Sequence, residues 1–318
     1  MISKSIKQSF LYNCLRSFYV LVSFSLGSYI RIKFGNRNAE ADKYNHDFSS
    51  IKSVFYWVYY LNYISLFKNI NNSRKLEYFN EYSLNLDGFA RIKDLDKDFL
   101  ENLKTFYLEK VKFDGALDEY FDALAKQGDV RPEGLNLLEY PDTLSQLLQR
   151  SSILPIVEQH LGIPFEDIHI YGKVDTLVKL TSERLAKAHD DALVFHRDHD
   201  SCKAVKVFFY LNDVEEGCGH HEIYLGSHRD LPLRLRPIRR YQKNEIEEHI
   251  NPSSLKRVVG KAGYGFIENT TCFHRGTVPT KGNRIIISLS FNDTKSIKRL
   301  QREKVGDEIL YAPLTNFC

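Results

Sequence analysis

The amino-acid sequence predicts an α+β fold, with helices in the first half and the short strands of a barrel or sandwich in the second half. Three observations support this prediction. Apolar residues recur at helical spacing in two stretches of the first half, they alternate in stretches of the second half, and Gly, Asn and Pro punctuate those stretches. The 318 residues, 43% of them hydrophobic and 27% charged, are enough for one large core with an appendage.

The sequence divides into two parts. The polar, Asn-rich segment 68–75 reads as a boundary. We therefore expect a helical N-terminal appendage at 1–75 and a main domain at 76–318.

Two uncharged, aromatic-rich runs lie in the appendage, at 17–30 and 53–67. Both are shorter than the roughly 20 residues that span a bilayer, so we interpret them as helices that cover part of the core. Peripheral contact of residues 1–67 with a membrane surface is a second interpretation, because basic residues and no acidic ones precede Glu40. A secretory signal is a third and poorer one, since no small-residue cleavage pattern follows the first run.

The main domain begins with a turn, a strand and two helical stretches. The segment 86–92 (LDGFARI) predicts a turn before a short strand. An Asp cap and four apolar residues then predict a helix, and residues 135–161 also read as helical. The four apolar residues are Phe99, Leu103, Phe106 and Val111.

In the second half, apolar residues alternate with polar ones at the two-residue period of β-strands. Alternation covers 175–181, 203–213 and 283–292, and 263–276 predicts two short strands. We expect one face of the strands to carry Val205, Val207, Phe209, Leu211, Ile285, Ile287, Leu289 and Phe291. The opposite face would carry Lys206, Phe208, Tyr210, Arg284, Ile286, Ser288 and Ser290.

Composition excludes two classes of protein. The five cysteines are odd in number, widely spaced and without a CxxC, which argues against a disulfide framework or structural zinc and favours a reducing, cytoplasmic compartment. The net charge of +3 comes without a basic stripe, so no nucleic-acid partner is predicted.

The segment 195–203, FHRDHDSCK, is the first candidate for chemistry. In an extended segment residues i and i+2 point to one side, so His196 and Asp198 can bind one metal ion. Mononuclear non-haem iron sites use two histidines and a carboxylate on one face of the ion. A charged surface loop is the alternative. His199 and Asp200 offer another ligand register, but the apolar run before His196 favours the first pair.

A distant segment supplies the missing ligand. His274 lies in FHRG, and a connection with Pro and Gly leads from it to Arg284. An antiparallel return would bring Arg284 back beside His274. A buried arginine needs an anionic partner, and a guanidinium suits a carboxylate, as a diacid cosubstrate anchored next to the metal would require.

Three segments together resemble the phytanoyl-CoA dioxygenase-like proteins. The run 195–229 contains an HxD, an apolar strand that ends in an acidic turn, a glycine-containing step and a GSH. The run 273–291 resembles the distal histidine and the 2-oxoglutarate arginine of this family, and 84–95 resembles its opening strand. The resemblance covers roughly 80–292 and leaves out the first 75 residues.

The resemblance implies a double-stranded β-helix (a jelly-roll or cupin-like barrel) with flanking helices, which binds Fe(II) and uses 2-oxoglutarate and dioxygen. By position it makes His196, Asp198 and His274 the iron ligands and Arg284 the anchor of the distal 2-oxoglutarate carboxylate. It also puts Phe208 beside the cosubstrate.

The implied reaction is hydroxylation of a small molecule, with release of succinate and CO2. Related halogenases lack an acid at the position of Asp198, so its presence favours hydroxylation. Lys179 is a further candidate for a polar contact with the cosubstrate.

Two features depart from the family or extend it. His220 and His221 are unusual before the GSH; we expect them at the surface, with entry into the pocket as the alternative. The basic segment 228–243 is either a solvated insert or a lid for an anionic substrate with an acyl, phosphate or nucleotide-linked group.

Two other functions stay open. The barrel could be a non-catalytic binding module, although Asp198 and Arg284 are both intact. It could also be a cupin-like metalloenzyme that does not use 2-oxoglutarate, an alternative against which Arg284 weighs.

Overall fold

The computed structural model describes residues 81–127, 134–179, 193–198, 205–229, 235, 240–294, 297 and 311–318. Apart from Leu235, these residues belong to one compact unit formed by Lys75–Asp230 and Arg240–Cys318. The expected appendage with its two apolar runs lies outside them, so its helices and its membrane contact stay predictions. Within the described ranges no helix is long and apolar enough to cross a membrane.

Helices fill most of the first half of the unit, as predicted. Asp96 caps the N-terminus of the predicted first helix by accepting a hydrogen bond of 2.9 Å from the backbone N–H of Phe99. The segment 135–161, expected to be helical, begins with a short strand at Leu135–Asn136 and then contains two α-helices, separated where Ser152 takes a left-handed φ of 53°. The α-helices are α4 Glu81–Asp87, α5 Lys97–Lys110, α6 Leu117–Gln127, α7 Pro141–Ser151, α8 Leu154–Leu161 and α10 Lys243–Glu247.

The described strands form two antiparallel sheets. In the larger sheet the order is β1-β9-β5-β11-β3-β12, with β2 also paired to β3. Its strands are β1 Phe89–Arg91, β2 Leu135–Asn136, β3 Ile168–Leu177, β5 Val205–Tyr210, β9 Gly265–Asn269, β11 Arg284–Asp293 and β12 Ala312–Pro313. In the smaller sheet the order is β7-β4-β10-β6-β8. Its strands are β4 Phe195–His196, β6 His221–Tyr224, β7 Arg240–Tyr241, β8 Leu255–Val258 and β10 His274–Gly276.

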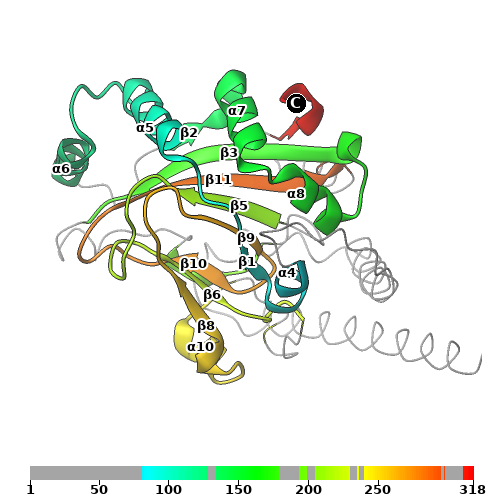
Figure 1. The fold of residues 1–318 in the computed structure, drawn as a ribbon. Helices are drawn as coiled ribbons and strands as arrows, with labels where there is room; N and C mark the ends of the chain where they lie inside the picture. The colour runs from blue at the N-terminus through cyan, green and yellow to red at the C-terminus, as the bar shows by residue number, and fades with distance from the viewer. Residues whose placement is uncertain are drawn as a thin grey trace, which may run out of the picture. The chain divides into compact units, whose positions relative to one another are not determined.

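The strand alternation divides the larger sheet into two faces as expected. One face carries the rows that begin at Val205 and Ile285, and it packs with the buried residues of α5, α6, α7 and α8 in the main core. On the other face Phe208, Tyr210 and Ile286 form a second cluster with Ile223 and Val258 of the smaller sheet. Helices α5, α6, α7 and α8 therefore cover one side of the larger sheet, and the smaller sheet faces its other side (Figure 1).

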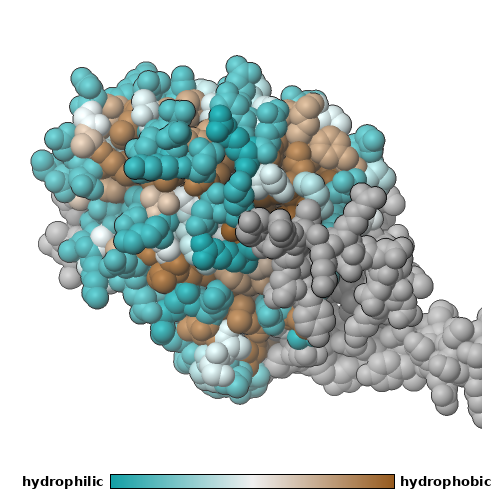
Figure 2. All heavy atoms as spheres, viewed as in Figure 1, coloured by the Kyte–Doolittle hydropathy of each residue, from teal (hydrophilic) through white to brown (hydrophobic). Residues whose placement is uncertain are grey.

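The molecule is thus a mixed α/β structure with large antiparallel sheets, as the sequence predicted. The strand expected at 175–181 is shifted toward the N-terminus: it spans Ile168–Leu177, because Ile168 and Ile170 add two buried positions before the expected start. Figure 2 shows that hydrophilic residues cover much of the described surface in this view. Among the described residues Val259, 41% exposed, is the large hydrophobic side chain that faces solvent.

A buried ion pair joins the strands of the smaller sheet on its outer face. Glu222 on β6 lies directly opposite Arg275 on β10 and Arg257 on β8. Its Oε2 accepts hydrogen bonds from Nε and Nη2 of Arg275, at 2.9 and 2.8 Å. Burial acts to raise the pKa of the Glu222 carboxyl, but His220 and Arg275 outweigh burial and lower the pKa from 4.5 to about 2.

We predict that Glu222→Gln lowers the free energy of unfolding by roughly 3 kcal/mol at pH 7. Because the pKa is depressed in the folded state, the stabilisation is complete above about pH 4.5 and is lost as the pH falls toward 2. Urea unfolding of wild type and variant should therefore show less than half of this loss at pH 3.

Glu101→Gln is the control, because Glu101 pairs with Lys104 at 2.8 Å but is 57% exposed. It should cost less than about 0.5 kcal/mol at either pH. Equal losses for Glu222→Gln at pH 7 and pH 3 would contradict the ion-pair explanation.

Candidate metal centre

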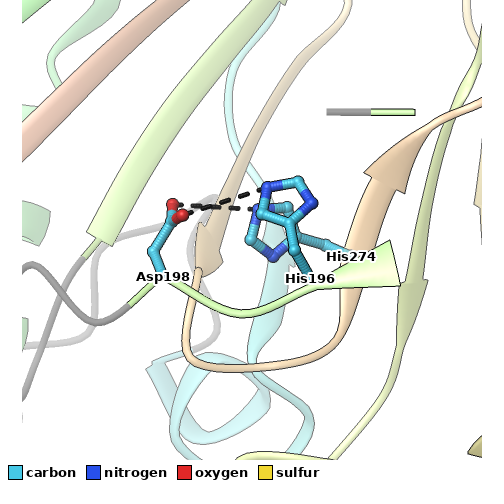
Figure 3. A group of neighbouring side chains, drawn as sticks. All are labelled: His196, Asp198 and His274. Carbon is cyan, nitrogen blue, oxygen red and sulfur yellow. Dashed lines mark ion pairs between the residues drawn. The ribbon is translucent and has the colours of Figure 1, made fainter. Parts of the chain in front are cut away.

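Two short strands of the smaller sheet bring the predicted histidines together. His274 on β10 is the cross-strand partner of His196 on β4, and the two ring centroids are 4.3 Å apart. Asp198 follows His196 by two residues, and its backbone N–H donates to the carbonyl oxygen of Thr270 at 2.8 Å. The three side chains offer ligand atoms that all lie within 4.8 Å of one another (Figure 3).

Both imidazoles have a fixed orientation. His196 Nδ1 lies 2.9 Å from the carbonyl oxygen of Val194, and His274 Nδ1 lies 3.0 Å from that of Cys272. A carbonyl oxygen can only accept, so each Nδ1 carries the proton and each Nε2 keeps its lone pair. The two Nε2 atoms face Asp198, at 3.9 and 3.8 Å from its carboxylate oxygens.

The protonation state of His196 also suits a ligand. Burial, followed by the neighbouring His274, lowers the pKa of His196 well below its usual value. The imidazole is therefore neutral at neutral pH, which is the form that binds a metal ion.

A lysine of the larger sheet holds the carboxylate. Lys206 Nζ lies 2.6 Å from Asp198 Oδ2, and Lys206 belongs to the inward-facing row of β5. This bond leaves the second oxygen of Asp198 directed at His196, 3.9 Å away. Lys206 therefore fixes the orientation of the carboxylate from the opposite sheet.

The donor set fits a first-row divalent metal ion. Two imidazole nitrogens and one carboxylate oxygen approach from one side, which is the arrangement that non-haem iron proteins use with open positions for other ligands. Backbone carbonyls behind both histidines are the outer contacts that such ligands usually make. The three residues can therefore hold a metal ion.

Arg284 lies beside the same strand. It is 7% exposed, and its Nη1 donates to the carbonyl oxygen of Gly219 at 2.6 Å. Its guanidinium also lies next to Gly276, where an added Cβ would be 3.3 Å from Nη2. Since Gly276 follows His274 by two residues on β10, Arg284 is on the metal-facing side of that strand.

Phe208 also faces the space between the sheets. Its ring lies 4.9 Å from that of Phe266 and 5.2 Å from that of His221. Phe208 therefore forms part of an aromatic wall on the larger sheet, close to a histidine of the smaller one.

Several other candidate residues are either exposed or outside the described residues. The side chain of Lys179 is exposed, so it makes no contact in the buried interior. His199 and Asp200 lie outside the described residues, as does most of the basic segment 228–243.

The expectation that His220 and His221 lie at the surface is wrong, since they are 6% and 5% exposed. His221 is buried because a carboxylate inside the protein binds it: its Nε2 lies 2.8 Å from Glu268 Oε2. The side chain of His220 lies on the side opposite to that of His221, where its Nδ1 is 3.1 Å from the hydroxyl oxygen of Thr277.

Glu268, which was not among the residues predicted from the sequence, is fully buried on β9. Its Oε1 lies 3.9 Å from Nε2 of His274, which is the nitrogen that His274 offers to a metal ion. Burial acts to raise the pKa of Glu268, but His221 and His274 outweigh burial and lower the pKa, so the side chain is ionised at neutral pH. The alternation of Phe266 and Glu268 on one face of a buried strand was the signal that could have identified it.

Comparisons with known proteins give matches among solved structures alone. No family model matches the sequence, and no curated protein matches it. One matched structure is the non-heme alpha ketoglutarate dependent epimerase SnoN from nogalamycin biosynthesis, at 19% identity over 67% of this chain and 80% of that chain, with a TM-score of 0.44. Another is HygX from Streptomyces hygroscopicus with nickel and 2-oxoglutarate bound, at 17% identity over 67% and 85%, with a TM-score of 0.45.

A third is the non-heme alpha ketoglutarate dependent carbocyclase SnoK, also from nogalamycin biosynthesis. It is 18% identical over 76% of this chain and 94% of that chain, with a TM-score of 0.46. At these identities and TM-scores the matches by themselves carry no conclusion about the activity of this chain.

We predict that His274→Ala and Asp198→Ala each weaken binding of Fe(II) or Co(II) by more than about tenfold, because each removes one of three ligands. Anaerobic calorimetry with the metal alone measures this. His249→Ala is the matched control, since His249 is an exposed histidine at the end of α10. Unchanged affinity in both ligand variants would show that the metal binds elsewhere.

Proposed function

We propose that this protein is an Fe(II)- and 2-oxoglutarate-dependent oxygenase that hydroxylates a small molecule. The observation that carries the proposal is the convergence of two oriented imidazole nitrogens and one carboxylate on a point between two antiparallel sheets. With this site, the phytanoyl-CoA dioxygenase-like pattern of the sequence favours a double-stranded β-helix as the description of the two sheets.

His196, Asp198 and His274 would hold the iron, and Arg284 would hold the distal carboxylate of 2-oxoglutarate. Arg284 suits this role because it is buried, and because the carbonyl oxygen of Gly219 fixes the direction of its planar donor group. Gly276 leaves the space that the guanidinium occupies beside β10.

Iron with 2-oxoglutarate and dioxygen supplies the power to oxidise a C–H bond, with release of succinate and CO2. The chain contributes orientation and exclusion of water. Lys206 fixes Asp198, the two backbone carbonyls fix the histidines, and the stacked rings of Phe208 and Phe266 close the adjacent interior to water. Because a carboxylate occupies the third ligand position, we propose hydroxylation rather than halogenation.

The proposed substrate is a small molecule with an anionic group. The support is the segment 228–243, which carries six basic residues against the single acid Asp230: Arg229, Arg234, Arg236, Arg239, Arg240 and Lys243. Arginine side chains bind phosphate and carboxylate groups through paired hydrogen bonds, so an acyl, phosphate or nucleotide-linked molecule fits this composition.

We predict that anaerobic titration of the Fe(II)-loaded protein with 2-oxoglutarate produces a visible metal-to-ligand charge-transfer band. Arg284→Gln should weaken 2-oxoglutarate binding by about 100-fold, since two hydrogen bonds to a charged group are worth roughly 3 kcal/mol together. Fe(II) affinity should be unchanged in this variant, because Arg284 is not one of the three metal-ligand residues.

Arg257→Gln is the matched control, since Arg257 is on β8 and 48% exposed. It should leave both affinities unchanged. A protein that binds iron but gives no band would favour the cupin-like metalloenzyme. A protein that binds no iron would favour the binding module.

A further inference from the structure

A second buried carboxylate adjoins the metal-binding group and has no role in the function proposed above. Glu268 is 0% exposed and lies on β9 of the larger sheet. In the register of that sheet it is directly opposite Lys206 on β5, so both side chains face the smaller sheet. Glu268 thus approaches the ligands from the sheet that does not carry them.

The two oxygens of Glu268 have different surroundings. Oε2 lies 2.8 Å from His221 Nε2, which fixes the side chain. Oε1 has no hydrogen-bond partner within the part of the chain that the structure describes, and it lies 3.9 Å from Nε2 of His274. A buried carboxylate oxygen without a partner destabilises the folded protein, so the protein retains it at a cost in stability.

The geometry indicates what the free oxygen can bind. Each Nε2 of the two ligand histidines carries a lone pair, so His274 cannot donate to Oε1 while its Nδ1 holds the proton. Glu268 also stands outside the group whose ligand atoms lie within 4.8 Å of one another. Glu268 Oε1 can therefore accept a hydrogen bond next to the metal position, but Glu268 is not itself one of the three ligand residues.

We propose that Glu268 Oε1 accepts a hydrogen bond from a protic ligand of the metal, water in the resting protein, bound next to His274. His221 is the positioning residue that holds Glu268 in place. This inference rests on the metal centre of the proposed function and not on its cosubstrate.

The arrangement of charges supports this assignment. Asp198 is a ligand whose charge is partly compensated by Lys206, 2.6 Å away. Glu268 would add a second negative charge near a divalent cation, and it would do so from a fully buried position, where charge interactions are strong. A carboxylate that binds a metal-bound ligand is a common outer contact of metal sites, and its loss typically costs about 10–100-fold in metal affinity.

The test is anaerobic calorimetry with Co(II) alone, with the visible spectrum of the bound Co(II) as a second readout. Glu268→Gln keeps the shape and the contact with His221 but removes the charge. It should weaken Co(II) binding by about tenfold or more and change the spectrum. Glu101→Gln is the control, a glutamate on α5 that pairs with Lys104 and takes no part in the smaller sheet, and it should leave Co(II) affinity and spectrum unchanged.

A double-mutant cycle tests the role of His221. His221→Gln should weaken Co(II) binding in the wild-type background but have little further effect in Glu268→Gln, because His221 acts through Glu268. Where Glu268→Gln does not fold, Glu268→Asp replaces it, since the shorter side chain keeps the charge and withdraws the oxygen from His274.

Wild-type Co(II) affinity and spectrum in Glu268→Gln would overturn the inference and leave Glu268 a structural link between the sheets. A wild-type protein that binds no Co(II) would overturn both this inference and the proposed function. A protein that binds Co(II) with the predicted Glu268 effect, yet does not bind 2-oxoglutarate, would overturn the proposed function alone.

Discussion

The register of β10 against β6 is the constraint on which the metal centre depends. On the inner face it places His274 opposite Ile223, and on the outer face it places Arg275 opposite Glu222. A shift of one residue would turn His274 to the outside and bury Arg275 among the ligands. Because the Glu222–Arg275 pair forms in one register alone, it specifies the register that directs His274 inward.

The two sides of the larger sheet differ in polarity. The side toward the helices is a continuous apolar core, as a stable fold of this size requires. The side toward the smaller sheet holds the partly buried Lys206 and the buried charged groups of Glu268 and Arg284, which are costly to bury. Stability alone would favour apolar residues on this side, so the charged groups there support the metal centre proposed for the space between the sheets.

Much of this organisation could be predicted from the sequence. Strict alternation from Arg284 onward determines which residues face the helices, and i to i+2 spacing determines that His196 and Asp198 share a side. The burial of His221 and its pairing with Glu268 could not be found in the same way. A histidine in a polar, glycine-containing segment resembles a surface residue, and the partner that buries it lies on another strand, in another sheet. Pairing between sheets is a property of tertiary packing that no local pattern carries.

The charges of the interior are ordered along β10. Carboxylates gather at the end near His274, where Asp198 and Glu268 approach it within 3.8 and 3.9 Å, and the guanidinium of Arg284 lies at the end near Gly276. Without a metal ion, the two carboxylates at the first end outweigh the single charge of Lys206, so this end repels an anion while the second end attracts one. A divalent ion reverses the sign at the first end alone. In the proposed function, a dianion such as 2-oxoglutarate then finds a positive group at both ends, so the metal ion must bind before the cosubstrate.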